Sequence, residues 1–169
     1  KKQYEYYRNE LFTFNSIHVE YVPLGLVCNK IISGKNKHRV DNGHYSVFGS
    51  TGVIGYSDEY VYENDTILIA RVGANCGYVH MATGCYDVSD NTLIIEPNEN
   101  KYVLKFAYYQ LTNSNLNQFA KGVGQPLITA GLIKSLKVPL PPIEDQARIV
   151  SILHRFYPLI NHITSCLHA

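Results

Sequence analysis

The sequence predicts an α+β fold, in which a curled sheet of mixed or antiparallel strands precedes a helical part, with coiled-coil-like helical stubs at both ends of the chain. Two observations predict it. From about residue 17 to residue 97, short β-rich runs alternate with Gly, Asn and Asp turns at a spacing of roughly 10 to 12 residues, which leaves no room for crossover helices. After Pro97 the apolar residues change to helical spacing.

The 169 residues suit one domain with its own core, and the composition excludes several classes of protein. No apolar run reaches the ~18 residues of a membrane span, and no apolar signal segment follows the first lysines. No Cys or His pair has the spacing of a zinc knuckle, a redox motif or a helical metal site. We therefore expect a cytoplasmic protein that binds no metal and does not enter a membrane.

The residues up to about position 12 are predicted to be helical. Tyr4, Tyr7, Leu11 and Phe14 follow one another at steps of three and four residues, which is the spacing of a narrow helix–helix seam. The sheet is predicted from runs rich in β-branched and aromatic residues, at 45–48, 52–56, 66–70, 77–80 and 91–95.

The chain beyond Pro97 is predicted to be largely helical. Leu104, Ala107, Tyr108 and Leu111 lie on one face of a helix. The elements expected after it are a shorter helix near 116–120, a helical turn about Gly131, a strand at 135–138 and a linker stiffened by Pro139, Pro141 and Pro142.

The last segment, from Ile143, is predicted to be a helix with a second seam. Its apolar residues recur at steps of four and three and keep a period of 3.5 residues, as in coiled coils. Pro158 is expected to kink or restart this helix. A seam for a partner helix is the favoured interpretation, and a helix packed on its own domain is the alternative. The seam residues are Tyr4, Tyr7, Leu11, Ile149, Leu153, Phe156, Ile160, Ile163 and Leu167.

The formal net charge is only +1, but the charges are segregated along the chain. Two windows, residues 21–40 and 101–143, contain no Asp or Glu and carry nine Lys or Arg side chains. Acidic residues gather elsewhere, notably at 58–65. If the two windows meet in the fold, they form the basic face that nucleic-acid binding requires, whereas ordinary solvated surface is the alternative.

Polar loops with cations are the best candidates for a binding site. The sequence lacks a phosphate loop, a dinucleotide-binding glycine motif and a nucleophile elbow, so we find no catalytic centre. The loop at 71–77 follows an apolar strand and carries Arg71 and Asn75, and the Gly-rich loop at 121–126 carries Lys121 and Gln125. Arg reads guanine and Asn or Gln reads adenine through paired hydrogen bonds. Turn formation is the alternative explanation for each loop.

Together these residues resemble the target recognition domain of type I restriction–modification specificity subunits. The passages that carry the resemblance are VFGSTGVIGY (47–56), TILIARVGANCGYV (66–79), DNTLIIEP (90–97) and GVGQPLITAGLIKSLKVPLPPIEDQARIVSIL (122–153). The opening KKQYEYYRNELFTF resembles the end of that family's conserved helical spacer, and RFYPLINHI the start of the next. Pro158 is unusual in such a spacer, and one recognition domain is present where a complete subunit has two. The chain is thus similar to the second half of a subunit, either as a fragment or as a natural half-subunit.

The resemblance implies a division into residues 1–14 (end of a spacer), 15–142 (DNA target recognition domain) and 143–169 (start of the distal spacer). It implies a non-catalytic subunit that reads one half-site of a split sequence in double-stranded DNA. The spacers of this family dock adenine-N6 methyltransferase subunits, which bind S-adenosylmethionine, and restriction–translocase subunits, which use ATP and Mg²⁺. This chain itself is expected to bind no cofactor.

On this interpretation two sets of residues are expected to contact DNA. The candidates for base edges are Ser50, Thr51, Arg71, Asn75 and Gln125. The candidates for phosphates are Lys30, Lys35, Lys37, Arg39 and Lys121.

Two other functions stay open from the sequence. The chain could be the recognition half of a fused methyltransferase–nuclease, which would require enzyme motifs in a longer parent chain. It could also be a half-subunit that acts only through its helical seam and shows no sequence preference on DNA. The exposed seams further suggest a homodimer that imitates the two-domain subunit.

Overall fold

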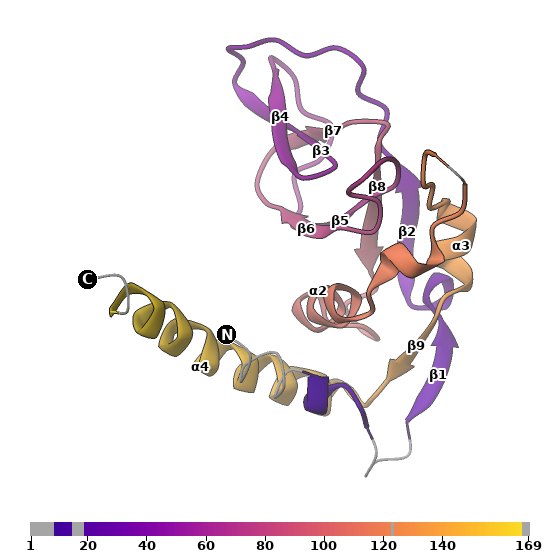
Figure 1. The fold of residues 1–169 in the computed structure, drawn as a ribbon, viewed down its shortest axis with the longest axis vertical. Coiled ribbons are helices and arrows are strands. Elements are labelled where there is room, and N and C mark those ends of the chain that lie inside the picture. Colours follow the sequence, from indigo (N-terminus) through magenta and orange to yellow (C-terminus); the bar gives the residue numbers. More distant parts are fainter. Residues whose placement is uncertain (1–8, 15–18, 123, 167–169) are drawn as a thin grey trace.

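The computed structural model describes residues 9–14, 19–122 and 124–166, and beyond residue 155 it describes only the backbone. The body contains three sheets with helices on one side, and a long helix extends from one end of it (Figure 1). The predicted α+β class, with antiparallel and mixed strands, is confirmed. Of the helices in the described ranges, none combines the length and apolar character needed to cross a membrane.

The central sheet has four antiparallel strands in the order β2-β8-β5-β6. These strands are β2 (Cys28–Ser33), β5 (Thr66–Ala70), β6 (Val79–Ala82) and β8 (Thr92–Pro97). Every residue of β5 is buried, because the sheet is covered on both faces. Ile67 and Ile69 enter one core, whereas Leu68 enters a second core on the opposite face.

A smaller sheet covers the Leu68 face. Its order is β4-β3-β7, formed by β3 (Tyr45–Gly49), β4 (Gly52–Ser57) and β7 (Tyr86–Val88). The β3–β4 pair is an antiparallel hairpin, whereas β3 and β7 are parallel, so the sheet is mixed. The core between the two sheets contains Leu68, Tyr86 and Ile94.

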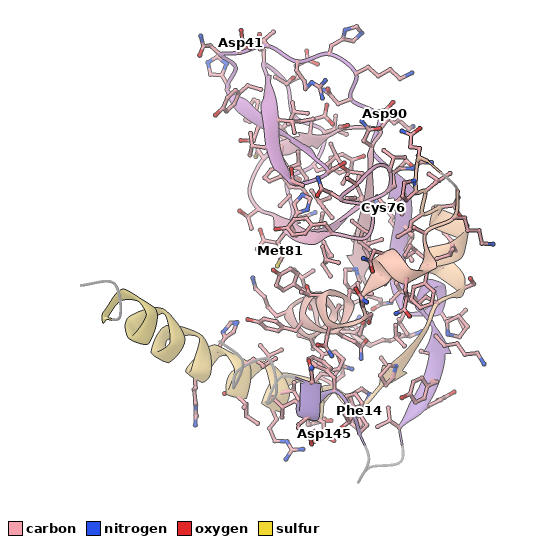
Figure 2. All side chains as sticks on the ribbon, viewed as in Figure 1. Phe14, Asp41, Cys76, Met81, Asp90 and Asp145 are labelled. Atoms are coloured by element: carbon pink, nitrogen blue, oxygen red, sulfur yellow. The ribbon has the colours of Figure 1, made fainter. Side chains whose placement is uncertain are left out.

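The larger core lies between the other face of the central sheet and the helices (Figures 1 and 2). Its fully buried side chains include Ile67, Ile95, Phe106 and Leu111. The covering elements are α2 (Leu104–Asn113), the short 3-10 helices η1 (Leu24–Leu26) and η2 (Leu116–Phe119), and α3 (Ala130–Ser135). The two ends of the recognition body are joined by a two-stranded antiparallel sheet, which consists of β1 (Glu20–Pro23) and β9 (Lys137–Leu140).

Gln146 connects the body to α4 (Ile143–Cys166) and explains part of the PLPPIEDQ passage. Its side chain is fully buried. The amide nitrogen donates to the carbonyl oxygens of Lys101 (2.9 Å) and Pro141 (2.8 Å), and the amide oxygen accepts from the N–H of Val103 (2.9 Å). One side chain therefore satisfies three backbone groups where α2 and α4 begin.

The first three turns of α4 pack on the domain itself. Ile149 and Leu153 are 5% and 1% exposed and belong to the larger core, and Leu11 packs against the same core. The interpretation that these residues form a seam toward a partner helix is therefore wrong for Ile149 and Leu153, because four residues of spacing place both on the face that α2 covers. The seam positions outside the described residues or side chains are Tyr4, Tyr7, Phe156, Ile160, Ile163 and Leu167.

The predicted elements compare closely with the observed ones. Runs 45–48, 52–56, 66–70 and 91–95 correspond to β3, β4, β5 and β8, and the helices and the last strand expected after Pro97 are present. Most of the helix expected up to about residue 12 lies outside the described residues. The sequence did not indicate β1, β2 or β7, which are short or carry exposed polar residues. Helix α4 continues through residue 158, so the predicted restart there is wrong: a proline removes one helical N–H, and the neighbouring hydrogen bonds hold the helix.

Candidate nucleic-acid interface

Arg71, directly after β5, joins several segments at one edge of the central sheet. Its guanidinium Nη1 donates to Ser33 Oγ (2.8 Å) and to the carbonyl oxygen of Asp90 (3.4 Å). Its backbone N–H donates to Asn91 O (3.0 Å), and its carbonyl accepts from the N–H of Ile128 (2.8 Å). The two acid-free windows, one containing Ser33 and the other Ile128, therefore meet at Arg71.

The loops at 71–77 and 121–127 are bonded to each other beside this point. The N–H of Gly73 donates to Pro126 O (3.1 Å), and Lys121 and Leu127 exchange backbone hydrogen bonds of 3.0 and 2.8 Å. Asn75, Lys121 and Gln125 are all exposed on these loops. Two segments distant in sequence thus present their polar side chains at the same edge.

The hairpin turn between β3 and β4 reaches this edge as well. Ser50 Oγ donates to Asn91 O (3.5 Å), the same carbonyl that accepts from Arg71, and Thr51 is exposed. The structure thus gathers all five base-edge candidates and Lys121 on one surface. We call this surface the loop rim, and define it as residues 33–36, 49–52, 71–77, 89–92, 121–122 and 124–127.

The side chain of Arg71 is less available for contact with a base than the sequence suggested. Its Nη1 is held by Ser33 and Asp90, and its buried Nε has no hydrogen-bond partner among the described residues. A paired contact with guanine would require the guanidinium to leave these partners. From this position, Arg71 connects the loops of the rim to one another.

The phosphate candidates separate into two groups. Lys35, Lys37 and Arg39 are exposed on the long β2–β3 connection, whose start is held at the loop rim by the N–H groups of Lys35 and Asn36 on Val88 O (3.0 and 2.9 Å). The connection then runs outward to Asp41 at the top of Figure 2. These cations therefore continue the basic surface away from the rim.

Lys30 differs from the other cations. Its Nζ lies 3.0 Å from Glu96 Oε2, and both line a hollow of about 290 Å³ together with Tyr62 and Glu63. This lysine is paired and stands beside the carboxylates of Glu63 and Glu96, which compete with a phosphate for its ammonium group. Lys30 is therefore less available to a phosphate than the other four candidates, and its contact with DNA stays a prediction.

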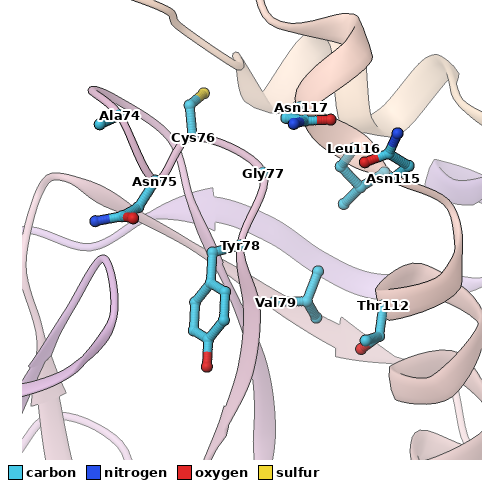
Figure 3. Close-up of a pocket in the computed structure, with 10 residues that line it drawn as sticks. All are labelled: Ala74, Asn75, Cys76, Gly77, Tyr78, Val79, Thr112, Asn115, Leu116 and Asn117. Carbon is cyan, nitrogen blue, oxygen red and sulfur yellow. The ribbon is translucent and has the colours of Figure 1, made fainter. Parts of the chain in front are cut away.

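A second hollow, also of about 290 Å³, lies between the 71–77 loop and the end of α2 (Figure 3). Its walls include Asn75, Tyr78, Thr112, Asn115 and Asn117. Sequence reasoning identified only Asn75 among these. The signal available for the others was the amide-rich stretch NSNLNQ (113–118), which interrupts the helical spacing after α2.

Burial shifts the pKa values of His80 and Cys28 in the central sheet. Desolvation lowers the pKa of His80 from 6.5 to about 4, so the ring is neutral at pH 7. The ring stacks between Phe48 (6.2 Å between centroids) and Tyr78 (5.7 Å). Burial also raises the pKa of the Cys28 thiol to about 12, so Cys28 is a neutral thiol.

Within the described ranges, no three His, Cys, Asp or Glu side chains are grouped to hold a metal ion.

Comparison with known proteins gives the same family that the sequence suggested. Residues 4–167 match the sequence model of the family described as type I restriction modification DNA specificity domain. The chain is 34% identical over 174 residues to the specificity subunit of the type I restriction enzyme EcoprrI from Escherichia coli, an alignment that covers 97% of this chain and 43% of that subunit.

Two solved structures share the fold. The S subunit of a type I restriction-modification system from M. genitalium superimposes with a TM-score of 0.74 at 20% identity, covering 99% of this chain and 50% of that one. The HsdS subunit from Thermoanaerobacter tengcongensis gives 0.72 at 19% identity, covering 98% and 45%. The chain therefore spans about half the length of the proteins it matches.

Proposed function

We propose that this chain, which belongs to the family of type I restriction modification DNA specificity domains, recognises a short, specific sequence in double-stranded DNA. The observation that carries the proposal is the loop rim, where segments from four parts of the chain converge around Arg71. Because the chain spans about half of its relatives, it reads one half of a split site.

The residues of the loop rim have two roles. One set contributes affinity for DNA, and the other determines the sequence preference. Lys35, Lys37, Arg39 and Lys121 contact phosphates and set the register on the duplex. The base-edge contacts come from Ser50, Thr51, Asn75 and Gln125, which are at the rim surface. Arg71 positions the loops through Ser33, Asp90 and Asn91.

We further propose an assembly on the pattern of this family. Residues 15–142 form the recognition domain, and residues 1–14 and 143–169 belong to helical spacers. The spacers dock the methyltransferase subunits, which bind S-adenosylmethionine, and the ATP- and Mg²⁺-dependent restriction subunit, all in the cytoplasm. The recognition chain is itself non-catalytic and binds none of these cofactors. Two copies pair through the distal part of α4, because Ile149 and Leu153 are already used by the domain core.

Selection from a randomised duplex library at moderate salt, with and without the methyltransferase subunit, tests the proposal. We expect enrichment of one short motif. A variant with Lys35, Lys37, Arg39 and Lys121 replaced by Ala should lose binding to all duplexes, whereas Lys30→Ala serves as a matched control and should keep it. Retention of DNA without any enriched motif would refute sequence recognition and favour a protein that acts only through its helices.

A further inference from the structure

The hollow between the 71–77 loop and α2 combines an apolar floor with an amide-lined wall (Figure 3). Val79 and Leu116, which are 7% and 1% exposed, form the floor. We call this site the amide pocket and define it by Asn75, Tyr78, Thr112, Asn115 and Asn117. Such a floor with a few polar groups around it suits a flat heterocycle better than an ion.

The three amides of the pocket are free to bind a ligand. Asn75, Asn115 and Asn117 are exposed, and within the described part of the chain their side chains make no hydrogen bond to another residue. The Thr112 hydroxyl, by contrast, donates to the carbonyl oxygen of Tyr108 (2.7 Å). The available hydrogen-bonding groups are thus the three amides, which pair a donor with an acceptor, and the hydroxyl of Tyr78.

The backbone holds these amides in place. Asn115 has φ 48° and ψ 56°, a left-handed conformation that Asn tolerates, between the end of α2 and η2. Gly77 lies so close to η2 that a Cβ there would come within 2.4 Å of Asn117 N. Tyr78, 51% exposed, has its ring stacked on His80 at an interplanar angle of 27°. The pocket is therefore formed before a ligand arrives, which reduces the entropy lost on binding.

The charges around the pocket favour a neutral base over a phosphate. The pocket is built from residues 74–79 and 112–117, which lie in two stretches, 66–86 and 101–143, that contain no Asp or Glu. A DNA strand could therefore approach without carboxylate repulsion. The wall next to Thr112 is the carbonyl end of α2, whose partial negative charge disfavours an anion and favours an amino donor.

From these observations we infer that the amide pocket binds the N6–N7 edge of an adenine in the recognised half-site. Asn side chains read this edge with one donated and one accepted hydrogen bond, to N7 and from the N6 amino group respectively. Asn115 and Asn117 supply the amides next to the helix end, whereas Asn75 lines the opposite side of the pocket and its side chain points away from these two amides (Figure 3). The inference rests on the proposed function and names the base that this part of the site specifies.

The test compares motifs selected from a randomised duplex library by the full chain and by variants. Asn115→Gly removes the amide and keeps the left-handed backbone, and it is combined with Asn117→Ala and Asn75→Ala. We expect the preference for adenine at one position to fall by about 5-fold to 150-fold, while the other positions stay unchanged. Asn100→Ala, at an exposed turn outside the pocket, is the matched control and should leave the motif intact.

Substitution of 7-deazaadenine, which lacks the N7 acceptor, separates direct reading from a folding defect. At the position where adenine is preferred, 7-deazaadenine should weaken DNA binding by the unsubstituted protein and leave DNA binding by the triple variant unchanged. The inference is overturned if the triple variant keeps the full adenine preference, or if deaza substitution has no effect at any adenine of the motif. If the unsubstituted protein enriches no motif at all, both the proposed function and this inference fail.

Discussion

Replacing Gln146 with Ala should unfold the junction between α2 and α4. The change removes three hydrogen bonds, of 2.8 to 2.9 Å, and leaves the carbonyls of Lys101 and Pro141 and the N–H of Val103 without their partner. A buried backbone group without a partner costs about 1–3 kcal/mol. Partial entry of water into the space left by the side chain offsets some of this cost. We therefore expect a loss of roughly 3–5 kcal/mol, which is a large share of the 5–15 kcal/mol that stabilises a typical domain.

Urea unfolding followed by circular dichroism measures this loss, and Glu144→Ala, an exposed change in the same turn of α4, is the control. The substitution Gln146→Glu adds a test of mechanism. A carboxylate would face two carbonyl oxygens, so its pKa should be raised in the folded state, and the destabilisation should grow as pH rises above the ordinary value of about 4.3. A loss below about 1 kcal/mol for Gln146→Ala, or a pH-independent effect of Gln146→Glu, would refute the reasoning.

Three further predictions follow from burial, backbone geometry and charge. Because burial lowers the pKa of His80 from 6.5 in the unfolded chain to about 4 in the folded protein, stability should fall as pH decreases from 6.5 toward 4, and His80→Phe should abolish this slope in urea unfolding. Gly77→Ala should cost about 1–3 kcal/mol more than Gly73→Ala in thermal unfolding, because both glycines have positive φ (90° and 80°) but only at Gly77 would the Cβ meet backbone; equal losses would contradict this. In DNA-binding titrations, Lys121→Ala should reduce the slope of log K against log salt by about 0.9, whereas Lys30→Ala, which breaks a pair with Glu96, should not.

The local sequence pattern was enough to predict much of the fold and the loops of the candidate site, because strand, turn and helix signals depend on neighbours in the sequence. The buried run at 66–70, the helix at 104–113 and the loops carrying Arg71 and Lys121 were all apparent from residue type and spacing. The two windows without Asp or Glu also indicated where a basic surface would form.

Only the tertiary structure decided which of these residues are free to act. Lys30 and Lys35 belong to the same basic window, yet the alternation of strand β2 and its register with β8 place Lys30 against Glu96, whereas Lys35 lies beyond the strand at the rim. The heptad spacing of Ile149 and Leu153 is equally compatible with a partner helix or with the domain's own core, and packing against α2 selected the core. Asn115 and Asn117 line a pocket only because η2 packs against Gly77, a contact between residues far apart in sequence. Such pairings depend on long-range packing, which spacing along the chain does not encode.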